Sequence, residues 1–304
     1  MNLYEQIQQN KRNSVLMILG VLVVVIGVVA LYSYNVRGDF ALPVIAAIFA
    51  IPSSLIGYYS GDKIALFTNG AKEMPDEAAP DVHNLIENLA ITAGIPKPKI
   101  YVINSPALNA FATGRDPEHA SIAVTTGLLA NLNRTELEGV IAHELSHVKN
   151  YDIRFATLVA IFVGFVVILS DLFTRSMWFG GMGRRNDREN NNAGGVLAVV
   201  GLILLLVSPI ITKIIQLAIS RQREYLADSS GAMLTRYPEG LASALEKIAH
   251  SKPMASAGHA TAHLFIANPF DAAQGKPFNA KSLGNLFSTH PPVAERIKRL
   301  REIG

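Results

Sequence analysis

The apolar residues of this chain gather into four long runs that are separated by polar and mixed stretches. Residues 15–31 and 40–59 form the first pair, and neither run contains a charged side chain between its apolar residues. Each run is long enough to cross a bilayer as a helix, although Pro43 and Pro52 interrupt the second. We therefore expect a transmembrane hairpin that is closed by a short turn at residues 35–39.

The second pair of apolar runs lies in the middle of the chain, at residues 155–172 and 196–218, and encloses a polar loop at 174–195. Two shorter runs, residues 99–103 and 121–125, are rich in residues that favour strands and are separated by turn residues. We expect these two short runs to belong to a small antiparallel sheet.

Residues 135–148 follow the periodicity of an amphipathic helix. Thr135 stands three positions before Glu138, which is the spacing of a capping box at the start of a helix. Apolar residues then recur at helical spacing beneath a polar stripe, at Leu137, Val140, Ile141, Leu145 and Val148. The pattern predicts a helix with one buried face.

The polar stripe of this helix carries the pattern H-E-x-x-H, at His143, Glu144 and His147. Residues four apart on a helix lie one above the other, so both imidazoles can reach one tetrahedral Zn²⁺. Glu144, next to the first histidine, is then placed to act on a water molecule at the metal. The spacing predicts a catalytic zinc site rather than a structural one.

A third protein ligand is needed, since a catalytic zinc site keeps its fourth position open. Glu224 and Asp228 share one face of a predicted helix directly after an apolar run. We assign Glu224 as the third ligand and Asp228 as the acceptor of the free ring N–H of a ligand histidine. The alternative is that both are solvated charges that pair with Arg221 and Arg223.

A second histidine pair, His259 and His263, has the same spacing as the first. It has no acidic residue beside its first member and lies in a stretch rich in Gly, Ala and Ser. We therefore interpret this pair as part of a loop or frayed helix that binds no metal.

Composition agrees with a membrane protein and excludes some other classes. Charged residues make up 17% and hydrophobic residues 50% of the chain, whereas charged residues are roughly 25% of an average soluble protein. The chain has no cysteine, which excludes disulfides and thiolate metal ligands. Its net charge of +3 is small, and no basic stripe with interleaved aromatic residues indicates a nucleic-acid partner.

Taken together, the motifs resemble the HtpX-type membrane-integrated zinc metalloproteases, which are related to the CAAX prenyl-protein endoproteases. Four blocks in the family's order carry the resemblance, which extends over nearly the whole chain: Asn109-Ala110-Phe111-Ala112-Thr113-Gly114, the His143–His147 motif, residues 223–228, and residues 288–292 with Arg296. The N-terminal sequence resembles that of members from Gram-positive bacteria.

The resemblance implies the same metal site that the spacing predicts, with one Zn²⁺ per chain held by His143, His147 and Glu224 and with Glu144 as general base. It adds His290, which in related enzymes lies near the metal and can hydrogen-bond the oxyanion of the tetrahedral intermediate.

The resemblance also implies an edge strand beside the active site, formed by Asn109, Ala110, Phe111 and Ala112 together with Thr113. Such a strand would hold an extended peptide substrate by backbone hydrogen bonds. A hairpin without substrate contact stays open as the alternative.

Membrane topology follows from the charges and the metal ligands together. Lys11 and Arg12 precede the first apolar run, which predicts a cytoplasmic N-terminus and a cytoplasmic catalytic domain after two crossings. Because His147 and Glu224 flank the second apolar pair and must meet at one metal, both members of that pair span the membrane or neither does. The net positive loop at 174–195 disagrees with export, and a hairpin packed in or beside the bilayer would remove this conflict.

The predicted fold class is an α+β membrane protein, mostly α-helical, with four hydrophobic segments and a zincin-like metalloprotease domain that contains the small antiparallel sheet. The division of the chain is a cytoplasmic tail (1–13), a transmembrane hairpin (14–60), the first part of the protease domain (61–154), the second hydrophobic pair (155–218), and the second part of the protease domain with the third ligand (219–304).

The predicted function is a zinc-dependent endopeptidase of the cell membrane, with misfolded or membrane-associated proteins as substrates and the lipid bilayer as its other partner. Its use in membrane protein quality control is what the resemblance implies. Two alternatives stay open: a processing peptidase for one specific motif, and a zinc-stabilised membrane scaffold without catalysis. The sequence leaves the oligomeric state open.

Overall fold

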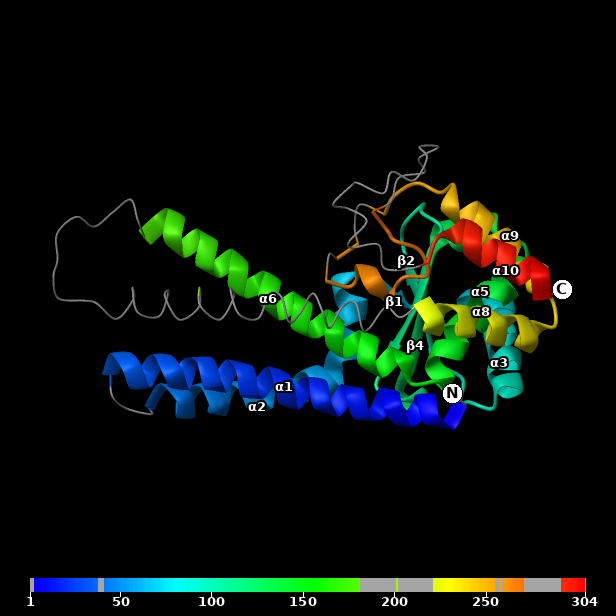
Figure 1. The fold of residues 1–304 in the computed structure, drawn as a ribbon. Helices are drawn as coiled ribbons and strands as arrows, with labels where there is room; N and C mark the ends of the chain where they lie inside the picture. The colour runs from blue at the N-terminus through cyan, green and yellow to red at the C-terminus, as the bar shows by residue number, and fades with distance from the viewer. Residues whose placement is uncertain are drawn as a thin grey trace.

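The computed structural model describes residues 3–37, 41–180, 201, 221–254, 257–258, 260–270 and 291–303. It has a compact part, which holds the sheet and the shorter helices, and three long helices that extend away from it side by side (Figure 1). The long helices are α1 (Leu3–Arg37), α2 (Ala41–Thr68) and α6 (Asp152–Gly180).

The shorter helices of the described residues surround the sheet. They comprise α-helices and short 3-10 turns, and their bounds are α3 (Pro80–Ala93), α4 (Thr126–Asn131), α5 (Arg134–Lys149), α8 (Arg221–Thr235), α9 (Pro238–Ala249), α10 (Val293–Ile303), η1 (Asp76–Ala78), η2 (Pro117–His119) and η3 (Ala262–Leu264).

The sheet has four strands in the order β1-β2-β4-β3, with β1 at Ala71–Glu73, β2 at Lys99–Ile103, β3 at Ala110–Gly114 and β4 at Ala120–Thr125. β1 pairs with β2 and β3 with β4 in antiparallel fashion, but β2 and β4 are parallel. The predicted purely antiparallel sheet is therefore wrong, and the sheet is mixed. The chain reverses once before β3 and once after it, so that β4 returns in the direction of β2.

The main core lies between this sheet and the helices of the compact part. Its fully buried members include Ile86 of α3, Ile122 of β4, Val140 and Leu145 of α5, and Leu241 of α9. Side chains of this size each contribute about 1.5–3 kcal/mol when they are fully buried. The core therefore fixes α5 rigidly against the sheet.

Three of the four predicted apolar runs lie in long helices, the first in α1, the second in α2 and the third in α6. α1 continues to Arg37, so residues 35–37 of the predicted turn are helical, and residues 38 and 39 lie outside the described residues. Most of the fourth run and residues 181–195 of the polar loop lie outside the described residues.

Within the residues that the structure describes, no helix combines the length and the apolarity that crossing a membrane requires. The four hydrophobic segments accordingly stay a prediction from the sequence.

Candidate metal centre

Helix α5 carries the H-E-x-x-H pattern, and its start differs by two residues from the prediction. The side chain of Asn133 accepts a hydrogen bond from the backbone N–H of Glu136 at 2.9 Å, and the Glu136 carboxylate accepts one from the N–H of Asn133 at 2.8 Å. The capping box is thus Asn133 with Glu136. Thr135 is inside the helix, where Glu138 pairs with Arg134 instead.

Two glycines allow neighbouring helices to approach α5 closely. A Cβ atom at Gly139 would lie 2.6 Å from the backbone nitrogen of Leu241 in α9, and one at Gly231 would lie 3.0 Å from the backbone nitrogen of His143. The second approach brings α8, which carries Glu224 and Asp228, directly against the histidines of the H-E-x-x-H pattern in α5.

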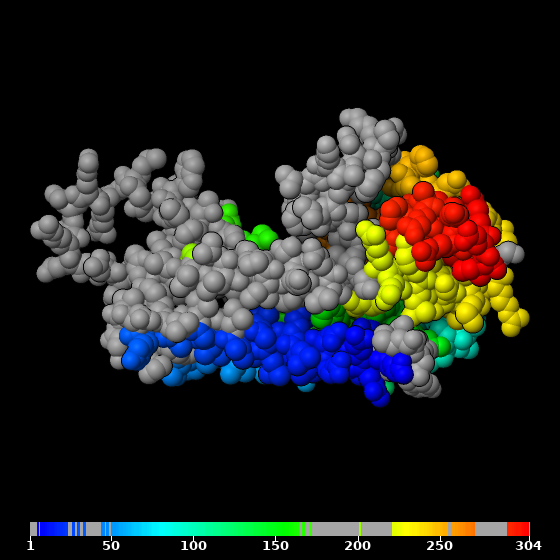
Figure 2. Space-filling view, viewed as in Figure 1, coloured from blue at the N-terminus to red at the C-terminus, as the bar shows by residue number. Residues whose placement is uncertain are grey.

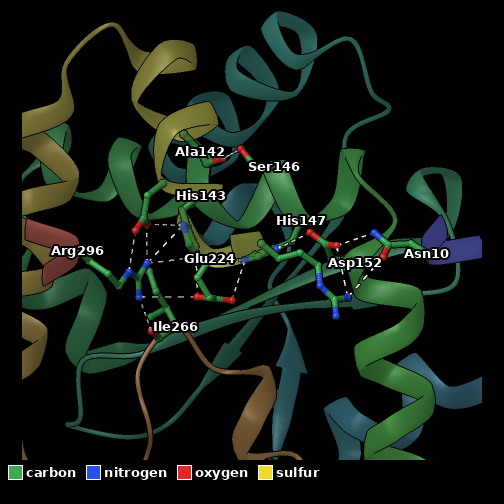
Figure 3. A network of polar contacts seen from close by, with 11 residues as sticks. Asn10, Ala142, His143, Ser146, His147, Asp152, Glu224, Ile266 and Arg296 are labelled. Atoms are coloured by element: carbon green, nitrogen blue, oxygen red, sulfur yellow. Dashed lines mark hydrogen bonds and ion pairs between the residues drawn. The ribbon is translucent and has the colours of Figure 1, made fainter. Parts of the chain in front are cut away.

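Three side chains from α5 and α8 converge on one point (Figure 3). The two Nε2 atoms of His143 and His147 are 3.2 Å apart. The Glu224 carboxylate oxygens lie 3.9 Å from Nε2 of His143 and 3.6 Å from Nε2 of His147. One potential ligand atom from each residue therefore lies within 4.8 Å of the others, which is compatible with a single bound metal ion.

The opposite ring nitrogen of each histidine faces a carboxylate. Nδ1 of His143 lies 3.0 Å from Asp228, and Nδ1 of His147 lies 3.0 Å from Asp152. These partners assign the Nδ1–H tautomer to both neutral rings, so each Nε2 presents a lone pair. When both rings are neutral, two lone pairs and a carboxylate face one another, an arrangement that suits a bound cation, and the donor set fits Zn²⁺.

Arg296 of α10 is the largest side chain buried at the centre and has no exposed surface. Its Nε and Nη2 atoms donate to the two carboxylate oxygens of Asp228 at 2.9 and 2.7 Å, and Nη1 donates to the Ile266 carbonyl at 3.2 Å. Burial by itself would raise the pKa of Asp228, but the charge of Arg296 and the hydrogen bonds from His143 and Arg296 hold it well below its usual range.

The two histidines differ in protonation. Burial lowers the pKa of His143 to about 4, because the hydrogen bond to Asp228 is offset by the charge of Arg296. Burial would likewise lower the pKa of His147, but the hydrogen bond to Asp152 and the charges of Glu224, Asp152 and Glu144 outweigh it and raise the pKa to about 9.

A small cavity of about 40 Å³ opens beside the converging ligands. It exceeds the volume of about 10–15 Å³ that one water molecule needs. Glu144 lines it and is almost completely buried. The other lining residues come from β3, α5, α6, α8, η3 and the segment after η3: Ala112, His143, His147, Asp152, Ile153, Ala156, Arg223, Glu224, His263, Leu264 and Ile266.

Strand β3 lies at the edge of the sheet, but only one of its residues reaches the cavity. Ala112 lines it, whereas Phe111 packs edge-on against Phe265 at a ring-centroid distance of 4.9 Å. The carbonyl of Ala110 accepts a hydrogen bond from the N–H of Ile266 at 2.9 Å. The outer edge of β3 at this point is therefore paired with the chain's own segment after η3.

Asn109, the residue before β3, binds the same segment. Its amide Nδ2 donates to the Ala267 carbonyl at 2.9 Å, and its Oδ1 accepts from the Ala267 N–H at 3.3 Å. Asn109 thus holds in place the segment after η3, which forms one wall of the cavity.

Several residues at the centre were not assigned roles from the sequence. Asp152 and Arg223 line the cavity, Arg296 lies behind it, and His263, interpreted as a loop residue, lies in η3 and lines the cavity as well. The position of Asp152, five residues after His147, is the one local feature of the sequence that could have indicated its contact with that histidine. The predicted oxyanion ligand His290 lies outside the described residues.

The chain is similar to known proteases over its full length. The family model described as peptidase family M48 matches residues 76–304. The Protease HtpX homolog of Caldanaerobacter subterraneus subsp. tengcongensis is 47% identical over 302 residues, which cover 99% of this chain and 98% of that protein. The Protease HtpX homolog of Streptococcus uberis, a Gram-positive bacterium, is 41% identical over 306 residues, which cover 99% of this chain and 100% of that protein.

The fold is similar to that of S. mikatae Ste24p, whose crystal structure matches with a TM-score of 0.51 at 20% sequence identity. The match covers 98% of this chain and 66% of Ste24p, so the chain spans just under two thirds of that protein's length. The family model and the full-length identities, rather than this fold likeness, establish the relationship. The chain belongs to peptidase family M48 and is an HtpX-type metalloprotease.

Proposed function

We propose that this protein is a zinc endopeptidase that hydrolyses peptide bonds of unfolded or membrane-associated proteins at the cytoplasmic face of the membrane. The observation that carries the proposal is the convergence of two imidazole nitrogens and one carboxylate, with both imidazoles oriented from behind by carboxylates. This arrangement leaves His143, His147 and Glu224 as the three protein ligands of one Zn²⁺ per chain.

A zinc ion bound here would act as a Lewis acid and would lower the pKa of a bound water towards about 7. Glu144 takes the proton of the attacking water and later delivers it to the leaving amine. The same carboxylate therefore acts first as general base and then as general acid. Its burial beside the cavity keeps it close to the reacting atoms.

Three further groups assist in this proposal. Asp228 holds the ring of His143 and thereby fixes its tautomer. His290 hydrogen-bonds the oxyanion as the peptide carbonyl is attacked. The substrate lies in the cavity against Ala112, beside the part of β3 whose outer edge pairs with the chain's own segment, while Asn109, Ala110 and Phe111 hold that segment in place.

Membrane association is supported by the HtpX relatives and by apolar side chains on the long helices. Val23 of α1 is 70% exposed, and Ile48 and Ile56 of α2 are 61% and 60% exposed. Apolar surface of this kind is rare on soluble monomers and marks contact with lipid or protein. We propose a multi-pass protein of the cell membrane, divided as the sequence predicts, with Lys11 and Arg12 on the cytoplasmic side.

The test compares two carboxylate variants of the full chain in detergent, Glu144→Gln and Glu224→Ala, by zinc content and by cleavage of an unfolded protein. Zinc-loaded wild type should cleave, and a chelator should abolish cleavage. Glu144→Gln should keep its zinc and lose about 10²- to 10⁴-fold in rate, the usual contribution of a general base. Glu224→Ala should lose zinc.

Glu138→Gln is the matched control, because Glu138 lies on the same helix but pairs with Arg134 away from the cavity. It should retain both zinc and activity. Equal loss of zinc in Glu144→Gln and Glu224→Ala would contradict the division of roles. Cleavage restricted to one sequence, rather than scattered along the substrate, would favour a dedicated processing peptidase.

A further inference from the structure

The N-terminal helix α1 carries a buried amide close to the metal centre. Asn10 is only 6% exposed, although its neighbours Gln9 and Arg12 are exposed. Its Nδ2 atom donates to the carboxylate oxygen Oδ1 of Asp152 at 2.7 Å and to the backbone carbonyl of Asn150 at 2.9 Å. Both amide protons are thus used at the junction between α5 and α6.

Asp152 connects this amide to a metal-binding residue. Its other oxygen, Oδ2, faces Nδ1 of His147 at 3.0 Å. Figure 3 shows Asn10, Asp152 and His147 in one continuous row that leads towards Glu224. The amide and the imidazole therefore bind opposite oxygens of one carboxylate and together fix its orientation.

The orientation of the amide is set by a charged neighbour. Oδ1 of Asn10 accepts a hydrogen bond from Nη1 of Arg223 at 3.4 Å, and the same Nη1 lies 3.9 Å from Oδ1 of Asp152. A flipped amide would direct its NH₂ group at the guanidinium and its oxygen at the carboxylate, which is unfavourable at both ends. Without Asn10, Oδ1 of Asp152 would lose its contact at 2.7 Å, whereas its contact to Nη1 of Arg223 is 3.9 Å long.

We propose that Asn10 is a positioning residue of the metal centre, which makes the N-terminal end of α1 a part of that centre as well as a membrane-proximal helix. The proposal rests on the metal site proposed above. Figures 1 and 2 agree with it, since the N-terminal end of α1 lies beside the compact part and below α8. Asn10 holds Asp152, Asp152 holds His147, and His147 is then oriented before the metal arrives.

The experiment is a double-mutant cycle that measures Zn²⁺ affinity in the full-length protein in detergent, by competition with a chromophoric chelator. Asp152→Ala removes the direct partner of His147 and should weaken affinity about 10- to 100-fold. Asn10→Ala acts one contact further away and should weaken it by about three- to tenfold. If Asn10 acts through Asp152, the double variant should bind as Asp152→Ala does.

Two further variants separate positioning from helix packing. Asn10→Leu keeps the branched shape at Cγ without hydrogen-bonding groups, so a loss that it shares with Asn10→Ala belongs to the amide. Ser14 is buried one turn after Asn10, and its hydroxyl donates a hydrogen bond to the Asn10 carbonyl. Ser14→Ala therefore changes the packing of the same helix without changing the amide, and it should leave zinc affinity unchanged. The absorption spectrum of the Co²⁺-loaded protein should shift in both Asn10 variants and not in Ser14→Ala.

Wild-type affinity in Asn10→Ala, or losses that multiply in the double variant, would overturn the proposal. An equal loss in Ser14→Ala would assign the effect to packing of α1 and would overturn it as well. Wild type that binds no zinc would overturn the metal site together with this inference. Failure of proteolysis alone would contradict the proposed reaction and leave the affinity cycle intact, so the two failures are distinguishable.

Discussion

The two histidines of the metal centre are held by carboxylates whose own partners differ. Asp228, behind His143, binds the buried guanidinium of Arg296 through both oxygens. Asp152, behind His147, binds the neutral amide of Asn10, and its contact to a guanidinium is 3.9 Å long. One side of the centre is an ion pair buried in the compact part, and the other is a hydrogen-bonded junction with the N-terminal helix.

This difference decides which imidazole is neutral before metal binds. On the first side Arg296 balances the charge of Asp228, and the pKa of His143, lowered mainly by burial, is about 4. On the second side, where burial also acts to lower the pKa, the hydrogen bond to Asp152 and the surrounding carboxylates outweigh it and give His147 a pKa of about 9. Of the two histidines in the pattern, His143 is therefore neutral and His147 holds a proton at neutral pH.

The largest effect is expected when the guanidinium of Arg296 is removed. Arg296→Met should lower the free energy of unfolding of the metal-free protein by about 3–5 kcal/mol, because Asp228 would be left as a buried charge without its main partner. Chemical denaturation in mixed micelles measures it. Arg301→Ala, on the same helix but with a half-exposed side chain, is the control and should lower the free energy of unfolding much less, because its ion pairs are solvent-exposed. A loss no greater than that of the control would contradict the buried ion pair.

The second prediction compares the two carboxylates directly. Asp228→Asn and Asp152→Asn should each weaken zinc affinity by about 10- to 100-fold, since each removes the anionic partner of one ligand histidine. Asp228→Asn should in addition destabilise the metal-free protein at every pH, because it removes the main partner of the buried Arg296. Asp152→Asn should destabilise the metal-free protein only below about pH 9, because the raised pKa of His147 contributes stability only while that ring holds its proton. Equal destabilisation by both variants above about pH 9 would remove the asymmetry between the two sides.

The third prediction concerns pH. Because the pKa of metal-free His147 is raised to about 9, this ring carries a proton at neutral pH and the metal must displace it. Zinc affinity should rise with pH through the neutral range and level off above about 9. Calorimetry at pH 7 in buffers of different ionisation enthalpy should detect about one released proton from the protein. Binding without release of a proton would contradict the protonated state of His147.

The smallest effect is expected at the start of α5, far from both carboxylates. Asn133→Ala should cost about 0.5–2 kcal/mol of stability through loss of the helix cap, without a change in zinc affinity. Thr135→Ala tests the position of the cap and should cost less, because Thr135 lies inside the helix. If thermal unfolding shows a larger loss of stability in Thr135→Ala than in Asn133→Ala, the cap predicted from the sequence at Thr135 would be supported instead.

Local patterns in the sequence were sufficient to predict the helix of His143 and His147 and to select Glu224, because helical spacing alone places these residues on the required faces. Asp228 followed from its spacing to Glu224. The capping box was misplaced because Asn133 with Glu136 and Thr135 with Glu138 have the same spacing, and only the observed hydrogen bonds separate them.

Contacts between distant parts of the chain could not be predicted in this way. Asn10 and Asp152 are 142 positions apart, and Arg296 and Asp228 are 68 positions apart, so no local pattern joins them. The sheet was predicted as antiparallel from two β-prone runs and the turn residues between them, which give no pairing directions. Because β3 lies between these runs in the chain and pairs with β4 at the outer edge, the chain reverses twice, and β2 and β4 are parallel.

The most direct test of the metal centre is zinc K-edge X-ray absorption of the stoichiometrically loaded full-length protein, compared with His147→Ala. We predict imidazole scattering from two rings at Zn–N distances of about 2.0–2.1 Å in wild type, and from one ring in the variant. A wild-type spectrum without imidazole scattering, or one that His147→Ala leaves unchanged, would contradict the centre described here.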